Sequence, residues 1–279
     1  MKDVLESLID NALTGFDNTF DQSLTILSGD LDQWIEVDKI ADPLRNFCYT
    51  IIGICLLIEL AQVASKVDML KWEHGLKVMV KMALSKVCID IAPDFLLACY
   101  KQSQAWIIGI KLDTFKIGET VKDLTIMEME NVNDFFAVMG MFVSMFILIL
   151  AVKLCGLIIQ VVAYGRMFEL YVYLVVSPVA CAFFPLGNGD GGGISRITSK
   201  FFKSFAAVCL QGVMMAVVLR LFGLIMANQI NSMIDAIDPS AGASAKITEY
   251  IFLMLLGGIA LVMSVMKCGS WAKSILDAA

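Results

Sequence analysis

The chain has 279 residues, of which 58% are hydrophobic and 17% are charged, and its mean hydropathy is +0.78. A soluble domain is about 45–50% apolar and about 25% charged. The composition excludes a disordered chain, a collagen-like chain and an ordinary soluble enzyme, and it indicates a protein largely surrounded by lipid. The net charge is −6, and residues 1–46 hold ten acidic and three basic side chains, so the remainder is close to neutral.

Residues 1–46 lack the basic start and the uninterrupted apolar stretch of a signal peptide. Apolar side chains recur at helical spacing between Val4 and Phe16. We therefore expect an acidic, amphipathic, extracytoplasmic segment before the first membrane span. It is predicted to pack against the bundle or the membrane surface, and the alternative is that it docks a partner.

Five apolar segments are long enough to cross a bilayer, which takes about 20 mostly apolar residues. They are residues 47–67, 135–164, 168–186, 205–226 and 250–266. The sequence therefore predicts an all-α polytopic membrane bundle of about five transmembrane helices, of which four form a core in residues 135–279. The glycine-rich stretch 187–193 is expected to be a flexible loop in that core.

Residues 76–100 are harder to assign. Their five charges make a poor lone span, and because these charges do not form a single stripe, the segment is also a poor interfacial helix. We expect residues 68–134 to be a cytoplasmic or partly re-entrant helical region, with a helix end or kink at Pro93. A membrane crossing at 76–100 would raise the number of spans to six.

Orientation follows from the distribution of Lys and Arg, which favour cytoplasmic segments. With five spans and an external N-terminus, fourteen of these residues lie on the cytoplasmic side and five outside. The external five include Arg166, in a short loop between the second and third spans. The prediction is an N-terminus outside and a C-terminus in the cytoplasm.

Four charged residues fall inside the predicted spans: Glu59, Lys153, Glu169 and Arg220. An ionisable group inside a membrane pairs with another or marks a functional path. At 1.5 Å per residue, Glu59 and Lys153 lie at similar depths, and Glu169 and Arg220 lie nearer the outer surface. We expect Glu59 to pair with Lys153 and Glu169 with Arg220. A proton or ion relay is the alternative.

Other residues in the spans bear on helix shape and packing. Pro178 and Pro185 are expected to bend or end the third predicted span, which neighbouring helices can accommodate. Gln211, Gly257 and Gly258 suit close contact between helices.

The sequence shows no catalytic, metal-binding or cofactor motif. His74 is the only histidine, and the eight cysteines include no Cys-x-x-Cys pair, so we expect them to be small apolar packing residues. The stretch 187–193 lacks the lysine and hydroxyl of a phosphate-binding loop. We therefore expect a protein that is not an enzyme and that holds neither metal nor cofactor.

Three stretches are similar to a known family. Residues 166–185 (RMFELYVYLVVSPVACAFFP) resemble the TrbL-type membrane subunit of conjugation and type IV secretion systems. Residues 201–215 (FFKSFAAVCLQGVMM) and 267–276 (KCGSWAKSIL) add to it. The resemblance extends over about residues 45–279, more loosely before residue 135.

The resemblance implies a homo-oligomer in the cytoplasmic (inner) membrane that forms part of a translocation channel for DNA or protein. It implies association with other channel subunits and secretion ATPases, and no catalytic residues. One bundle of five helices is too small to enclose such a path, so we expect a ring of copies. The alternative is a small-solute or ion transporter or channel, which would favour inverted repeats that this sequence does not show.

Overall fold

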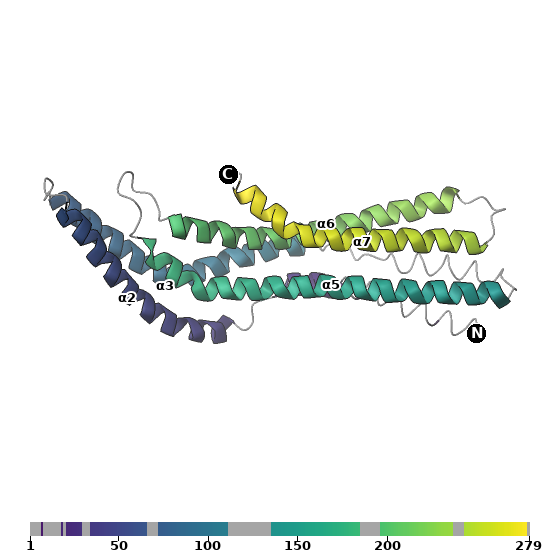
Figure 1. Ribbon diagram of the computed structural model, residues 1–279, viewed down its shortest axis with the longest axis horizontal. Coiled ribbons are helices and arrows are strands. Elements are labelled where there is room, and N and C mark those ends of the chain that lie inside the picture. The colour runs from purple at the N-terminus through teal and green to yellow at the C-terminus, as the bar shows by residue number, and fades with distance from the viewer. Residues whose placement is uncertain are drawn as a thin grey trace. The chain divides into compact units, whose positions relative to one another are not determined.

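The computed structural model describes residues 7, 18, 21–29, 34–65, 72–110, 135–184, 196–236 and 243–277. Long helices account for nearly all of them (Figure 1). These helices are α2 (Trp34–Ser65), α3 (Trp72–Ile110), α5 (Phe135–Ala182), α6 (Arg196–Ala236) and α7 (Ala243–Asp277). No strand occurs in the described ranges, so the prediction of an all-α fold is confirmed there.

Four of the described helices contain a segment long and apolar enough to cross a membrane. These segments are Asp42–Ala61 in α2, Phe146–Ala182 in α5, Arg196–Met226 in α6 and Phe252–Leu276 in α7. Each has at least the roughly 20 residues, or about 30 Å, that cover the hydrocarbon core of a bilayer. The chain is therefore a multi-pass membrane protein by the length and composition of its helices.

The number and limits of these segments differ from the five predicted spans. Residues 135–164 and 168–182 lie in one helix of 48 residues, about 72 Å long, rather than in two spans joined by a loop. No proline separates the two apolar runs, and Gly165 alone costs a helix only about 1 kcal/mol. Arg166, predicted to lie in an external loop, is helical and buried.

The ambiguous segment 76–100 lies within α3, which is not one of the four apolar spans. Pro93 is buried inside this helix, which continues to Ile110 instead of ending there. Pro178 is likewise buried inside α5, four residues before its last residue. Pro185 and the loop 187–193 lie outside the described residues.

The described chain divides into two compact units. Unit 1 comprises residues 1–29, 104–165 and 211–271, and unit 2 comprises residues 30–103, 166–210 and 272–279. Four long helices, α3, α5, α6 and α7, therefore contribute different segments to the two units.

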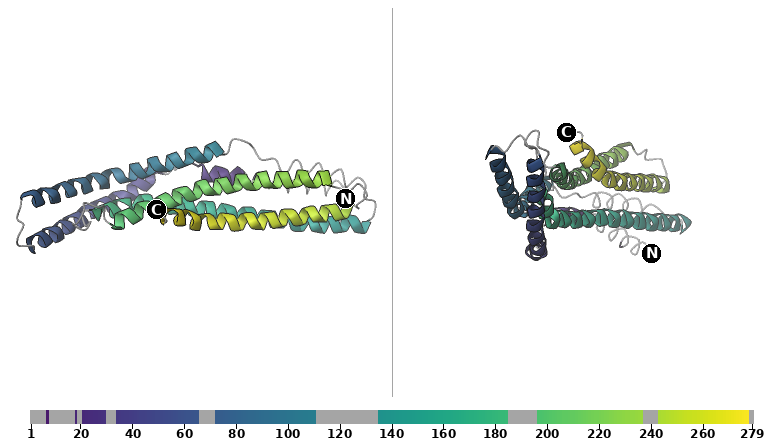
Figure 2. Two further views of the ribbon diagram at one scale, coloured as in Figure 1. Left: turned by 90° about the horizontal axis from the view of Figure 1, so that it is seen from above. Right: turned by 60° about the vertical axis from the view of Figure 1, so that its left-hand side comes forward.

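In unit 1 the segments of α5, α6 and α7 lie side by side (Figure 2). Their buried apolar side chains recur at helical spacing, as in Met215, Leu219, Phe222 and Met226 of α6. This periodicity places one stripe of each helix in a shared core.

The N-terminal segment 21–29 belongs to the core of unit 1. Leu27 is buried in it, Gln104 donates its amide to the Gly29 carbonyl, and Gln160 donates to the Gln22 side-chain oxygen at 3.2 Å. Most of the predicted amphipathic helix at residues 4–16 lies outside the described ranges. Segment 21–29 thus packs against the helices of unit 1.

Unit 2 holds two clusters of buried apolar side chains. One joins Leu96 and Tyr100 of α3 to Leu170 of α5 and Phe205 of α6. The other joins α2, α3 and α5 through Cys48, Ile52, Ile89, Ala92, Cys181 and Ala182. Ser85 ties α3 to the end of α5 by donating its hydroxyl to the Cys181 carbonyl at 3.0 Å.

Candidate functional site

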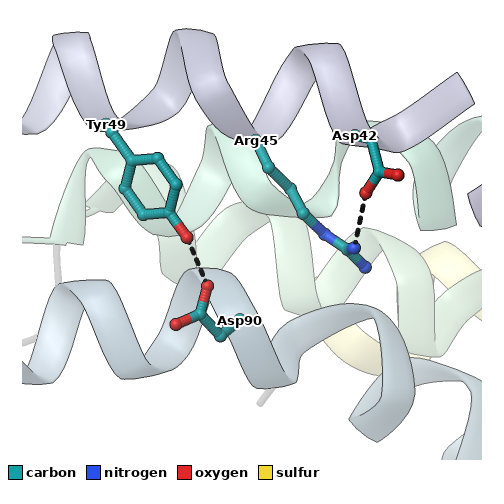
Figure 3. Close-up of polar contacts among 4 residues, drawn as sticks. All are labelled: Asp42, Arg45, Tyr49 and Asp90. Carbon is teal, nitrogen blue, oxygen red and sulfur yellow. Dashed lines mark hydrogen bonds and ion pairs between the residues drawn. The ribbon is translucent and has the colours of Figure 1, made fainter. Parts of the chain in front are cut away.

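Polar side chains gather where α2 meets α3 in unit 2 (Figure 3). The Tyr49 hydroxyl donates to the Asp90 carboxylate at 2.5 Å. One turn before Tyr49, Arg45 pairs with Asp42 across 3.0 Å. Tyr49 and Asp90 are both exposed. The contact therefore joins two helices along an accessible surface.

A second polar contact joins the same helices farther along. Lys81 of α3 lies 3.0 Å from Glu59 of α2, with side chains 32% and 13% exposed. One Glu59 oxygen accepts this bond, and the other is buried without a hydrogen-bond partner in the described part of the chain. Glu59 thus has a cationic partner in the next helix of the chain.

The outward side of α3 carries two kinds of residue. Lys86, Asp90 and Asp94 follow at four-residue intervals and are all exposed; we call them the polar stripe. The apolar ridge consists of the exposed side chains Leu76, Val80, Leu84, Val87, Ile91 and Phe95. At 100° per residue its centre lies about a quarter turn from that of the stripe. The buried residues Ser85, Ile89, Ala92 and Leu96 face the core.

The predicted pair of Glu59 and Lys153 is not found among the described contacts. Lys153 is exposed on α5, and no ion pair of Lys153 occurs within the described ranges. It is flanked on the same face by the exposed side chains Leu150, Leu154 and Leu157. Because Glu59 and Lys153 belong to different units, their pairing stays a prediction.

The predicted pair of Glu169 and Arg220 also stays a prediction. Glu169 is half-buried on the part of α5 in unit 2, and Arg220 is half-buried on the part of α6 in unit 1. Neither residue is fully exposed, as expected for charges in apolar helices.

Arg166 is a polar residue that the sequence prediction missed. Its side chain is only 2% exposed. Its Nε donates to the Val208 carbonyl at 3.1 Å and its Nη2 to the Cys209 carbonyl at 3.5 Å. The missed signal was the four-residue spacing of Arg166, Leu170 and Leu174, which share one buried face of α5.

Glycines allow close contact between the helices of unit 1. A Cβ at Gly257 of α7 would lie 2.8 Å from Met226 Cε of α6, and one at Gly258 would lie 3.4 Å from Cys155 Sγ of α5. Gln211 lies against Gly269, whose Cβ would come within 3.2 Å of its Nε2. These small residues let α7 approach both neighbours.

The described residues contain no group of three or more His, Cys, Asp or Glu side chains that could hold a metal ion. All eight cysteines are free thiols. Cys99 is exposed and the other seven are buried or half-buried. The polar contacts found here thus join and orient helices, and the exposed ones present charge at the surface.

Part of the chain is similar to a known protein family. Residues 46–178 match the family model described as TrbL/VirB6 plasmid conjugal transfer like protein. No curated protein and no solved structure matches the chain.

The matched region begins in α2, contains all of α3 and ends at Pro178 of α5. It includes Tyr49, Glu59, Lys81 and Asp90, in the part of the chain where the sequence resemblance is looser. Of the three stretches that suggested the family, only residues 166–178 lie within the match. The α2–α3 contacts are therefore a feature of the matched region, and over residues 46–178 this chain is similar to the TrbL/VirB6-like plasmid conjugal transfer proteins.

Proposed function

We propose that the protein is a channel or scaffold subunit of a conjugative type IV secretion apparatus in the cytoplasmic membrane. The observation that carries the proposal is the family match, which covers two helices with apolar spans and the helix between them. No catalytic step is proposed for this chain. Its contribution is the helical surface that it presents in the membrane.

A homo-oligomer follows from the size of the bundle. Helices about 10 Å wide pack around their own side chains, and the unit 1 core is filled with residues such as Leu148, Ile159 and Leu219. A packed core leaves no path for single-stranded DNA or an extended protein. We therefore propose a ring of copies, assembled with the other channel subunits and the secretion ATPases, with DNA or protein as cargo.

Gene deletion tests the proposed role. Removing this gene from its mobile element should abolish DNA transfer to a recipient, and a copy expressed in trans should restore it. Crosslinking in native membranes, followed by native mass spectrometry in mild detergent, should show an oligomer. Undiminished transfer would contradict the role in conjugation. A monomer in both membranes and detergent would contradict the ring and favour the small-solute or ion transporter.

A further inference from the structure

The helix α3 lies beside a membrane span although it is not apolar enough to be one. Its contacts with α2 set the register: Asp90 meets Tyr49 and Lys81 meets Glu59. Residues 81–90 of α3 thus run antiparallel beside residues 49–59 of α2. Both contact points on α2 fall inside the span Asp42–Ala61. The charged middle of α3 therefore lies level with an apolar span.

Two of the charges of α3 are accommodated by α2. Lys81 is paired with Glu59, and the Asp90 carboxylate accepts the Tyr49 hydroxyl. Charged groups inside membranes are tolerated when they pair with one another or with polar neighbours. The charges of α3 disfavour it as a membrane helix, and these contacts compensate two of them.

The apolar ridge of α3 matches the thickness of a bilayer. It runs from Leu76 to Phe95, a length of about 30 Å, which equals the hydrocarbon thickness. Half or nearly half of each side chain is exposed, as for Ile91 at 54%. A continuous exposed ridge of that length, beside a span of the same length, fits lipid acyl chains.

The polar stripe cannot share that environment. Lys86 and Asp94 are exposed on α3, and exposed charges at membrane depth face water or protein rather than lipid. The stripe holds two acids and one base, so it offers no cluster of cations to grip phosphates. A surface of mixed charge fits the wall of a path through which a charged chain passes without binding tightly.

We propose that α2 and α3 enter the membrane as a helical hairpin whose apolar ridge contacts lipid and whose polar stripe faces the water of the translocation path. This inference rests on the proposed function, because the path is formed between copies. Counting α3 as a crossing also gives five membrane helices, α2, α3, α5, α6 and α7. An odd number of crossings keeps the termini on opposite sides of the membrane.

Thiol labelling in membranes that contain the assembled apparatus tests the two faces. Cys99 is the exposed native cysteine, so Cys99→Ala serves as the background. Asp94→Cys and Lys86→Cys probe the stripe. Ile91→Cys is the matched control, because it lies one turn from Asp94 on the same helix and is also exposed.

A charged, water-soluble methanethiosulfonate should modify Asp94→Cys and Lys86→Cys about tenfold faster than Ile91→Cys, because the reactive thiolate forms in water and not in lipid. A lipid-soluble maleimide should reach Ile91→Cys. Modification of Asp94→Cys should also lower DNA transfer, while Ile91→Cys should transfer normally. Two stripe positions keep the test informative if one variant does not accumulate.

Equal aqueous labelling of stripe and ridge would show that the hairpin lies outside the membrane and would overturn the inference. Protection of both the stripe and the ridge positions from the aqueous reagent would show that protein covers the stripe, and this would also overturn the inference. Crosslinking of the same membranes separates the two proposals. An oligomer with a protected stripe overturns only the hairpin inference, whereas a monomer overturns the ring on which it rests.

Discussion

Lys81 Nζ of α3 lies 3.0 Å from Glu59 Oε1 of α2. Without this ion pair, the apolar span of α2 would contain the Glu59 carboxylate with no cation beside it. Because the second Glu59 oxygen is buried without a hydrogen-bond partner in the described chain, the carboxylate depends on Lys81 for its compensation. The stability of the hairpin should therefore respond strongly to this pair.

Lys81→Met should destabilise the protein by about 2 kcal/mol, less than the cost of breaking a fully buried pair because Lys81 is 32% exposed. The double variant Glu59→Gln with Lys81→Met should recover part of that loss. The level of protein in the membrane and its melting temperature in mild detergent are the measurements.

Lys153→Met is the control for this pair, since no ion pair of Lys153 occurs among the described residues. It should leave the melting temperature nearly unchanged. Rescue of Lys153→Met by Glu59→Gln, without rescue of Lys81→Met, would instead support the pair predicted from the sequence.

Tyr49→Phe should weaken the hairpin without unfolding it. The change removes the hydroxyl that donates to Asp90, and a hydrogen bond to a charged group contributes about 1.5–3 kcal/mol, less where both groups are exposed. We expect a fall in melting temperature of a few degrees. Tyr164→Phe is the matched control, because Tyr164 is an exposed tyrosine with no described hydrogen bond; an equal effect there would argue against the Asp90 contact.

The sequence predicted the helical class and the apolar segments well because long apolar runs have few alternatives in lipid. It misjudged α5 because a single basic residue between two apolar runs resembles a loop. Arg166 is instead buried and held by carbonyls of α6, a partner far away in sequence. Depth counting could not reveal that arrangement.

Partners that are distant in sequence also explain why the contacts between α2 and α3 were not predicted. Depth alone offered Lys153 as a partner for Glu59, but Lys81 becomes available only once α3 folds back along α2. The sequence of α3 distributes charged, exposed apolar and buried apolar residues over three faces of the helix. The contacts with α2 and α5 show which of these faces is buried. Helical periodicity identifies the residues that share a face of α3, and the contacts between helices show which face is buried and which residue pairs with Glu59.

Arg166→Glu should prevent normal accumulation of the protein. A carboxylate there would be buried facing the Val208 and Cys209 carbonyl oxygens, with no donor from Arg166, at a cost of about 3 kcal/mol or more. Arg166→Lys should be milder because an ammonium still donates. Immunoblots of membranes compare these variants with Lys203→Glu, an exposed change on α6; if both glutamates behave alike, the burial of Arg166 does not matter.

Gly257→Leu should disrupt the packing of α7 against α6. Even a Cβ there would lie 2.8 Å from Met226 Cε and 3.3 Å from Phe222 Cε2, so a larger side chain must push the helices apart, at a cost of about 1–3 kcal/mol. Gly257→Ala should cost less, because the nearest atom is the flexible end of a methionine. Gly140→Leu on α5 is the control, since nothing lies within 4 Å of its Cβ position. Melting temperatures in mild detergent should rank the control highest, Gly257→Ala next and Gly257→Leu lowest. If Gly257→Leu melts with the control, α7 does not approach α6 as closely as this contact requires.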